Sequence, residues 1–199
     1  MASTDDDKYQ QQRIAAIRAA ASVFAEKGFH GATTRDIAGR LGIQQGSLYY
    51  YFSSKEEALH EVCLLGLSDY AARMQSIVES NQPFAAKLLA SVTSHLSCYR
   101  ENNEALKVYN DERLYLPKEK RSTLKALGSG YRQALEDILL VAQSDGDVGS
   151  SVNCRMGAQS IIGLCNAWGH LLVRDPDLDL FGVVQHCTDM LLTGLQPSY

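Results

Sequence analysis

The chain has 199 residues, of which 45% are hydrophobic and 21% charged, enough for one domain of ordinary size and a smaller second one. It has no run of 18 apolar residues, and its start, MASTDDDKYQQQ, is polar and acidic. These features argue against a membrane span and a secretory signal and predict a cytoplasmic protein. The net charge of −4 alone would argue against a nucleic-acid partner.

The distribution of charge changes that interpretation. Residues 8–55 carry seven Lys or Arg against two acidic residues, whereas residues 56–199 carry twelve against eighteen. A basic N-terminal segment on an acidic remainder is typical of a DNA-binding head joined to a separate second domain.

Helical periodicity dominates the whole chain, and no segment alternates as a strand would. After a disordered tail over residues 1–8, a first helix should end at Gly28. Thr33 and Asp36 form a capping box for a two-turn helix that Gly42 ends, and a short helix follows over 45–51. A second capping box, Ser54 to Glu57, opens a helix that runs to about residue 78.

Further helices are expected at about 84–101, 104–113, 118–143, 153–173 and 179–194, the last one capped within DPDLD at 175–179. The predicted fold is therefore all-α, with a three-helix DNA-binding head and a larger C-terminal helical domain. We place the head at residues 9–54 and the C-terminal effector and dimerisation domain at 55–199.

Two short helices that meet at a glycine predict a helix-turn-helix motif. The motif needs apolar residues at the crossing, a small residue at the closest approach and glycine at the turn. Seven positions fill these roles in order: Ile37, Ala38, Leu41, Gly42, Ile43, Leu48 and Tyr51.

Four consecutive aromatic residues, Tyr49 to Phe52, follow two glutamines in this motif. At 100° per residue, Tyr51 and Phe52 share a face with Leu48 and should pack against the head. Tyr49 and Tyr50 point the other way, toward DNA.

The run ATTRDIAGRLGIQQGSLYYYFSSKEEAL, preceded by EKGFHG, resembles the DNA-binding signature of the TetR family of bacterial transcriptional regulators. The resemblance implies a homodimer that binds an inverted-repeat operator in double-stranded DNA and no enzymatic activity. It further implies a C-terminal domain that binds a small effector, which releases the repressor, and that dimerises through the last two long helices.

The resemblance assigns DNA contacts to the start of the second helix, the recognition helix and the start of the fourth: Thr33, Thr34, Arg35, Gln44, Gln45, Gly46, Ser47, Tyr49, Tyr50 and Lys55. Two positions depart from the family pattern, because Gln45 stands where Lys is frequent and Tyr50 where His is frequent. Loss of the cation should flatten the salt dependence of DNA binding by about one phosphate contact.

Polar and aromatic residues of the C-terminal domain are candidates for an effector pocket: His95, Tyr99, Tyr109, Arg113, Asn166, Trp168 and His170. Each of them can equally be a core residue with a satisfied hydrogen bond. Arg113 precedes a basic run from Lys118 to Arg132 that weakly resembles regulators of acyl-CoA type. Either an acyl-CoA or a neutral hydrophobic molecule fits this pattern.

Apolar residues of the last two helices are candidates for a dimer interface, although residues at this spacing also fit an interior core: Met156, Ile161, Leu164, Leu171, Val184, Cys187 and Leu191. The alternative function is a helix-turn-helix activator or effector-independent regulator without a ligand pocket.

No nucleophile elbow, zinc motif or phosphate loop indicates catalysis, a cofactor or a metal. The five cysteines are far apart and are expected to be buried, reduced thiols.

Overall fold

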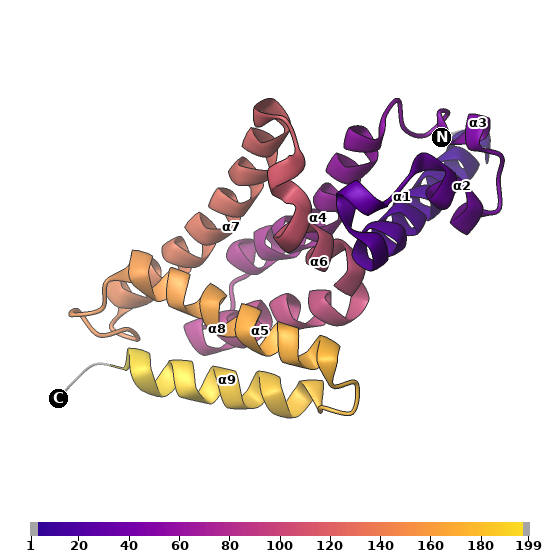
Figure 1. Cartoon of the computed structure of the whole chain (residues 1–199). Helices are drawn as coiled ribbons and strands as arrows, with labels where there is room; N and C mark the ends of the chain where they lie inside the picture. Colours follow the sequence, from indigo (N-terminus) through magenta and orange to yellow (C-terminus); the bar gives the residue numbers. More distant parts are fainter. Residues whose placement is uncertain (1–3, 197–199) are drawn as a thin grey trace. The chain divides into compact units, whose positions relative to one another are not determined.

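The structure is a computed structural model that describes residues 4–196 apart from the side chains of residues 4, 5 and 69. Over these residues it is helical without strands, which confirms the predicted all-α class (Figure 1). The elements are α1 (Thr4–Gly31), α2 (Thr34–Leu41), α3 (Gln45–Leu48), α4 (Lys55–Glu79), α5 (Phe84–Glu101), α6 (Asn103–Glu112), the 3-10 turn η1 (Arg113–Tyr115), α7 (Lys118–Asp145), α8 (Cys154–Arg174) and α9 (Leu180–Leu195).

The chain divides into two compact units. The head unit consists of residues 1–67 and 102–124, and the C-terminal unit of residues 68–101 and 125–199. This division differs from the boundary that we expected at residues 54 and 55, because α6, η1 and the start of α7 belong with the head. In the residues described, no helix has both the length and the apolar composition that crossing a membrane requires.

Local capping explains several helix starts. The predicted capping box of α2 is present, with Asp36 N–H bonded to Thr33 Oγ1 and Thr33 N–H to the Asp36 carboxylate. Asp179 accepts the amide protons of residues 181 and 182 and so caps α9 as expected. At α4 the box is modified: Ser54 accepts the Glu57 amide, but the Glu57 carboxylate reaches back to Ser53.

The N-terminal boundary of α1 differs from the expectation of a tail over residues 1–8. The helix begins at Thr4, and residues 1–3 of the expected tail lie outside the described part of the chain. The polar segment before residue 13 lacks an apolar stripe, so helical periodicity could not reveal this extension.

The end of α1 is held by α6. Gly28 interrupts the helix with φ 69° and ψ 167°, and the next amide, Phe29 N–H, donates to the Glu112 carboxylate over 3.0 Å. Lys107 Nζ donates to the carbonyl of Ala25 over 2.7 Å, and the Tyr115 ring stacks on Phe29. Three contacts from residues 102–124 therefore position the last turn of α1 within the head unit.

We expect Gly28→Ala to lower the free energy of unfolding of the head unit by about 1–3 kcal/mol, because a side chain is strained at this positive φ. The added Cβ would also lie 3.3 Å from Glu112 Oε1. Urea unfolding followed by circular dichroism measures the loss. Gly39→Ala is the matched control, since Gly39 lies within α2 in open space, and equal stability of the two variants would contradict this account.

The C-terminal unit is built around α5, which packs against both α8 and α9. The crossing of α5 and α8 is close: a Cβ on Gly169 would lie 2.3 Å from the Tyr99 ring. Arg100 at the end of α5 donates to the carbonyls of Pro176 and Leu178 in the loop between α8 and α9. Glycine at 169 thus lets an aromatic side chain lie directly on the backbone of α8.

Candidate functional site

The first turn of α2 presents an exposed polar surface. Arg35 is exposed and forms no ion pair with any residue that the structure describes, whereas Asp36 is bonded to Lys27 Nζ at 2.7 Å. The hydrogen bond from Lys27, with those from Thr33, holds the pKa of Asp36 far below its ordinary value. Thr33 is thereby committed to capping, and Thr34 and Arg35 remain the polar groups that this turn can offer to a phosphate.

The recognition helix α3 is short and presents small polar residues. Gln44, Gln45, Gly46 and Ser47 are all exposed, and nothing lies within 4 Å of a Cβ added at Gly46. Gln45 Nε2 donates to Thr34 Oγ1 over 2.9 Å, so α2 orients the Gln45 amide. Its carbonyl oxygen has no hydrogen bond to the described residues, which leaves an acceptor for a base edge in the major groove.

The aromatic run divides largely as predicted. Leu48 and Phe52 are each 2% exposed and anchor α3 in the head core, whereas Tyr49 and Tyr50 are 55% and 81% exposed. Tyr51 is only half-buried: its ring stacks on Tyr9 with centroids 6.2 Å apart. Tyr51 also packs against the buried core of the head unit, as expected, so it joins that core to the N-terminal extension of α1.

Lys55 has a different role from the DNA contact that the resemblance assigned. Its ammonium donates to the carbonyls of Phe29 and Ala32 over 2.9 and 3.0 Å and lies 4.4 Å from the centroid of the Phe29 ring. The lysine thus satisfies carbonyls at the end of α1 that the helix leaves open. We therefore assign it a structural role in the head.

A buried polar cluster occupies the interior of the C-terminal unit. His95 Nε2 lies 3.0 Å from Asn166 Oδ1, which also accepts the Tyr99 hydroxyl proton over 2.9 Å. Nε2 therefore carries the ring proton, and Nδ1 accepts from the Tyr131 hydroxyl over 2.9 Å. Tyr70 completes the cluster, with its ring centroid 4.7 Å from that of His95. Four helices contribute: α4, α5, α7 and α8.

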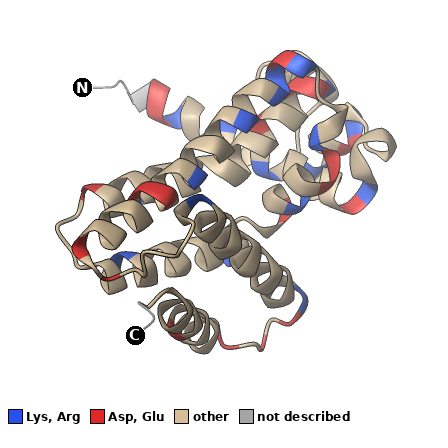
Figure 2. Cartoon of the chain, turned by 90° about the vertical axis from the view of Figure 1, so that its left-hand side faces the viewer, with Lys and Arg blue, Asp and Glu red and all other residues tan. Residues whose placement is uncertain are grey.

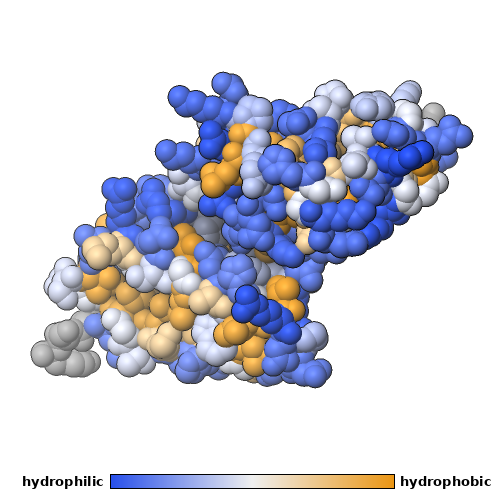
Figure 3. All heavy atoms as spheres, in the orientation of Figure 1, coloured by the Kyte–Doolittle hydropathy of each residue, from blue (hydrophilic) through white to orange (hydrophobic). Residues whose placement is uncertain are grey.

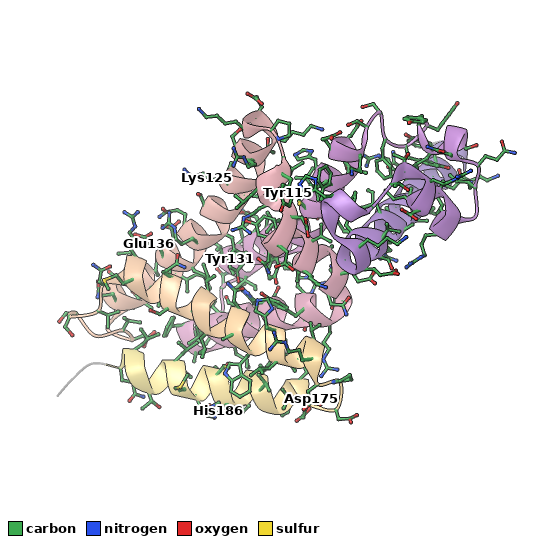
Figure 4. All side chains as sticks on the ribbon, in the orientation of Figure 1. Tyr115, Lys125, Tyr131, Glu136, Asp175 and His186 are labelled. Carbon is green, nitrogen blue, oxygen red and sulfur yellow. The ribbon has the colours of Figure 1, made fainter. Side chains whose placement is uncertain are left out.

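The predicted effector residues separate into three places. His95, Tyr99 and Asn166 lie in this cluster, and His170 contacts the Tyr99 ring at 5.5 Å. Trp168 instead contacts His186 of α9. Figure 4 labels His186.

Tyr109 and Arg113 belong to the head unit. The Arg113 guanidinium lies over the Tyr109 ring and donates to carbonyls at the end of α6, so this pair is not part of the cluster.

Sequence reasoning missed Tyr70 and Tyr131. A signal was present, because both tyrosines continue apolar stripes: Tyr70 follows Leu59 and Val62 along α4, and Tyr131 lies between Leu124 and Leu135 along α7. Tyrosine in a core-facing stripe brings a hydroxyl that needs a partner, and this predicts a buried polar contact. Figure 4 shows Tyr131 on α7.

Burial lowers the pKa of His95 from 6.5 to about 4, against a smaller opposing effect of its bond to Asn166. The folded protein therefore keeps His95 neutral, while the unfolded chain takes up a proton as the pH falls through 6.5. The contribution of neutral His95 to the free energy of unfolding is fully present above pH 6.5 and is lost as the pH falls from 6.5 to 4. The loss is about 3 kcal/mol, because one pKa unit corresponds to about 1.4 kcal/mol.

Urea unfolding monitored at Trp168, the single tryptophan, measures this loss in the C-terminal unit. We expect His95→Gln to flatten the pH dependence over this range, whatever its stability at pH 7. An unchanged slope in the variant would show that other groups cause the dependence.

The exposed face of α8 and α9 is apolar and nearly free of charge. Between Met156 and Val173, α8 has no acidic or basic residue other than His170, and α9 has Asp189 and His186 (Figure 2). Figure 3 shows apolar residues gathered over these two helices. The large exposed members are Met156, Leu171, Val173, Phe181 and Met190.

Three residues predicted for a dimer interface are corrected to core residues of the C-terminal unit, where each is at most 4% exposed: Ile161, Val184 and Cys187. Met156 and Leu171 are exposed, and Leu164 and Leu191 are half-buried. All five cysteines are free and buried, as expected. Burial raises the pKa of the Cys63 and Cys165 thiols to about 12, which disfavours the reactive thiolate.

Comparison with known proteins agrees with this geometry. Residues 16–62 match the sequence profile described as "Bacterial regulatory proteins, tetR family", and residues 81–195 match that of "Tetracyclin repressor-like, C-terminal domain". The HTH-type transcriptional repressor KstR2 of Rhodococcus jostii is 33% identical over 138 residues, which cover 69% of this chain and 68% of KstR2.

Two solved structures show the same fold. PfmR of Thermus thermophilus, a TetR family transcriptional regulator, superposes with a TM-score of 0.83 at 25% identity, covering 91% of this chain and 98% of PfmR. FadR of Bacillus subtilis in complex with stearoyl-CoA gives a TM-score of 0.76 at 24% identity and covers 92% of this chain and 99% of FadR.

Proposed function

Because the chain belongs to the TetR family of bacterial transcriptional regulators, we propose that it is a homodimeric repressor released from an inverted-repeat operator by an acyl-CoA. The observation that carries this proposal is the helix-turn-helix surface of the head. There, two buried anchors hold α3 while its polar residues and two tyrosines are exposed. Such a surface offers hydrogen bonds to bases and phosphates of a major groove.

The proposed DNA contacts are supported by the exposure of these side chains and by hydrogen-bonding groups that other residues do not occupy. Arg35, which is exposed, and Thr34, which is half-buried, lie at the N-terminus of α2 and would contact a phosphate, whereas the exposed Gln45 and Ser47 would contact base edges. Tyr49 and Tyr50 add hydroxyls on the same surface. These side chains are the ones whose removal should weaken operator binding.

The homodimer is supported by the face of α8 and α9. On α8, an exposed stripe contains Ser160, Gly163 and Ala167 between Met156 and Leu171. Small residues at this spacing let a second helix approach closely, and the large apolar residues at either end would be removed from water. A two-fold pair of heads matches an inverted repeat.

The acyl-CoA class is supported by similarity and by the chain itself. The FadR structure of the same fold contains stearoyl-CoA, and the interior of the C-terminal unit here contains polar groups from four helices. Within the C-terminal unit, the exposed Lys125 of α7 supplies a cation suited to a phosphate.

Regulation requires that a change in the C-terminal unit reaches the head. The chain passes between the two units at three points: within α4 after Leu67, between Glu101 and Asn102, and within α7 after Leu124. The segment between the last two carries Glu112, which bonds Phe29 N–H at the end of α1. Displacement of this segment would shift α1 and lower operator affinity by the coupling free energy.

Fluorescence anisotropy of a labelled operator tests the proposal. Palmitoyl-CoA should release the DNA at micromolar concentration, whereas free coenzyme A should not. Glu112→Gln should weaken this response, because the charge-assisted bond to Phe29 N–H becomes a neutral one. Release by neither palmitoyl-CoA nor shorter acyl-CoAs would contradict the effector assignment.

A further inference from the structure

Two hydrogen-bonding groups of the buried polar cluster have no partner among the residues that the structure describes. Tyr70 is 6% exposed and contacts the rings of His95 and Tyr131, but its hydroxyl makes no hydrogen bond to a described residue. The side-chain amide nitrogen of Asn166 also has none, because the recorded bonds of this residue all reach its oxygen. Neither atom is fully enclosed: Asn166 is only partly buried, and among the described residues His60 Nε2 is the one fully buried side-chain nitrogen or oxygen without a partner. Both donors can therefore reach a bound molecule.

Both unpartnered groups can donate. The Asn166 nitrogen carries two N–H groups, and the Tyr70 hydroxyl carries one proton. They belong to α8 and α4, and His95 of α5 contacts both residues. The group that either donor would bind is an acceptor oxygen.

The cluster favours an uncharged partner. None of Tyr70, Tyr99, Tyr131 and Asn166 carries a charge, and His95 is neutral at pH 7 because burial lowers its pKa to about 4. A carboxylate placed here would lose its hydration without gaining a counter-charge, which is costly. A ketone or alcohol oxygen loses much less hydration free energy than a carboxylate when it is buried here.

We propose that Tyr70 and Asn166 recognise a neutral ketone or alcohol oxygen on the apolar part of the effector. The inference rests on the proposed function, in which the C-terminal unit binds the effector. It narrows the proposed effector class to acyl groups that carry a ketone or alcohol oxygen and disfavours plain hydrocarbon chains. Tyr131 and Tyr99 hold His95 and Asn166 in position, so these two tyrosines are positioning residues.

Binding of two small probes tests this recognition directly. The wild-type protein should bind 2-undecanone at least tenfold more tightly than undecanoate in a thermal-shift titration at pH 7. Tyr70→Phe and Asn166→Leu should each weaken ketone binding by roughly fivefold, the loss of one neutral hydrogen bond. Tyr115→Phe, an exposed tyrosine of the head unit, is the control and should change nothing.

The side-chain amide signals of Asn166, assigned by their absence in Asn166→Leu, should shift in the NMR spectrum on addition of the ketone. Equal affinity for both probes, or ketone binding unaffected by both variants, would overturn the inference. A purely structural role would lower the stability of the variants without changing the ratio of the two affinities, and would overturn it as well.

A second assay separates this inference from the proposed function. With operator DNA bound, 11-oxododecanoyl-CoA should release the protein at about one tenth of the concentration that dodecanoyl-CoA requires, a tenfold preference that corresponds to about 1.4 kcal/mol. If neither thioester releases the protein from DNA but the ketone still binds through Tyr70 and Asn166, the proposal of an acyl-CoA effector fails, whereas the proposed recognition of a neutral oxygen stands. If both thioesters release the protein at the same concentration, the proposal of an acyl-CoA effector stands, whereas the proposed recognition of a neutral oxygen fails.

Discussion

Gly163→Glu should leave the chain folded but lower operator affinity by a factor of about 10²–10⁴, the gain that linking two binding heads provides. Gly163 lies in the exposed stripe of α8, with nothing within 4 Å of an added Cβ, so a side chain there does not disturb the C-terminal unit. In the proposed two-fold dimer, this position meets its own copy or a neighbour on the partner helix. Two buried carboxylates would then face an apolar surface without counter-charges.

Sedimentation equilibrium and operator anisotropy, performed on the same preparation, measure the mass and the affinity. Gly130→Glu is the matched control, because Gly130 is an exposed glycine within α7 that also has open space around it. The control should remain dimeric and bind DNA normally. A Gly163→Glu protein that is still a dimer would contradict the assignment of the α8 face.

Phe52→Ala should lower the free energy of unfolding of the head by about 3–5 kcal/mol, as expected for a fully buried phenylalanine. Phe52 and Leu48 are the buried anchors of the recognition helix, each 2% exposed. Removing one of them leaves a cavity under α3, and the loss of operator affinity should follow from the loss of structure.

Tyr49→Ala should show the opposite behaviour. Tyr49 is 55% exposed, so its truncation should change stability by less than about 0.5 kcal/mol. Operator affinity should nevertheless fall about tenfold, through the loss of contacts to the groove or backbone. Urea unfolding followed by circular dichroism, together with anisotropy on both variants, gives the comparison. Two variants with the same free energy of unfolding would refute the division of the aromatic run into core and DNA-contacting residues.

The head could be predicted closely because its signals are local. Gly42 adopts φ 75° at the end of α2, and Thr33 and Asp36 form the expected capping box. Turn and cap residues act within four positions of each other, so their spacing is visible in one sequence. The helices of the C-terminal unit were located by the same local periodicity.

Contacts between distant segments could not be predicted in this way. Lys55 looks like a surface cation at a helix start, yet it bonds carbonyls more than twenty residues away. Tyr109 and Arg113 share the composition of the pocket candidates, but α6 packs in the head unit. Spacing along one helix identifies a face, and it does not identify the element that covers that face.

Selection of bound sites from a pool of random double-stranded DNA, followed by titration of the enriched sequence, tests the central claim most directly. A dimeric helix-turn-helix regulator should enrich an inverted repeat with half-site centres about one helical turn apart or a multiple of it. It should bind that repeat at least about a thousandfold more tightly than scrambled DNA. Enrichment of no inverted repeat, or equal affinity for the scrambled sequence, would contradict the account.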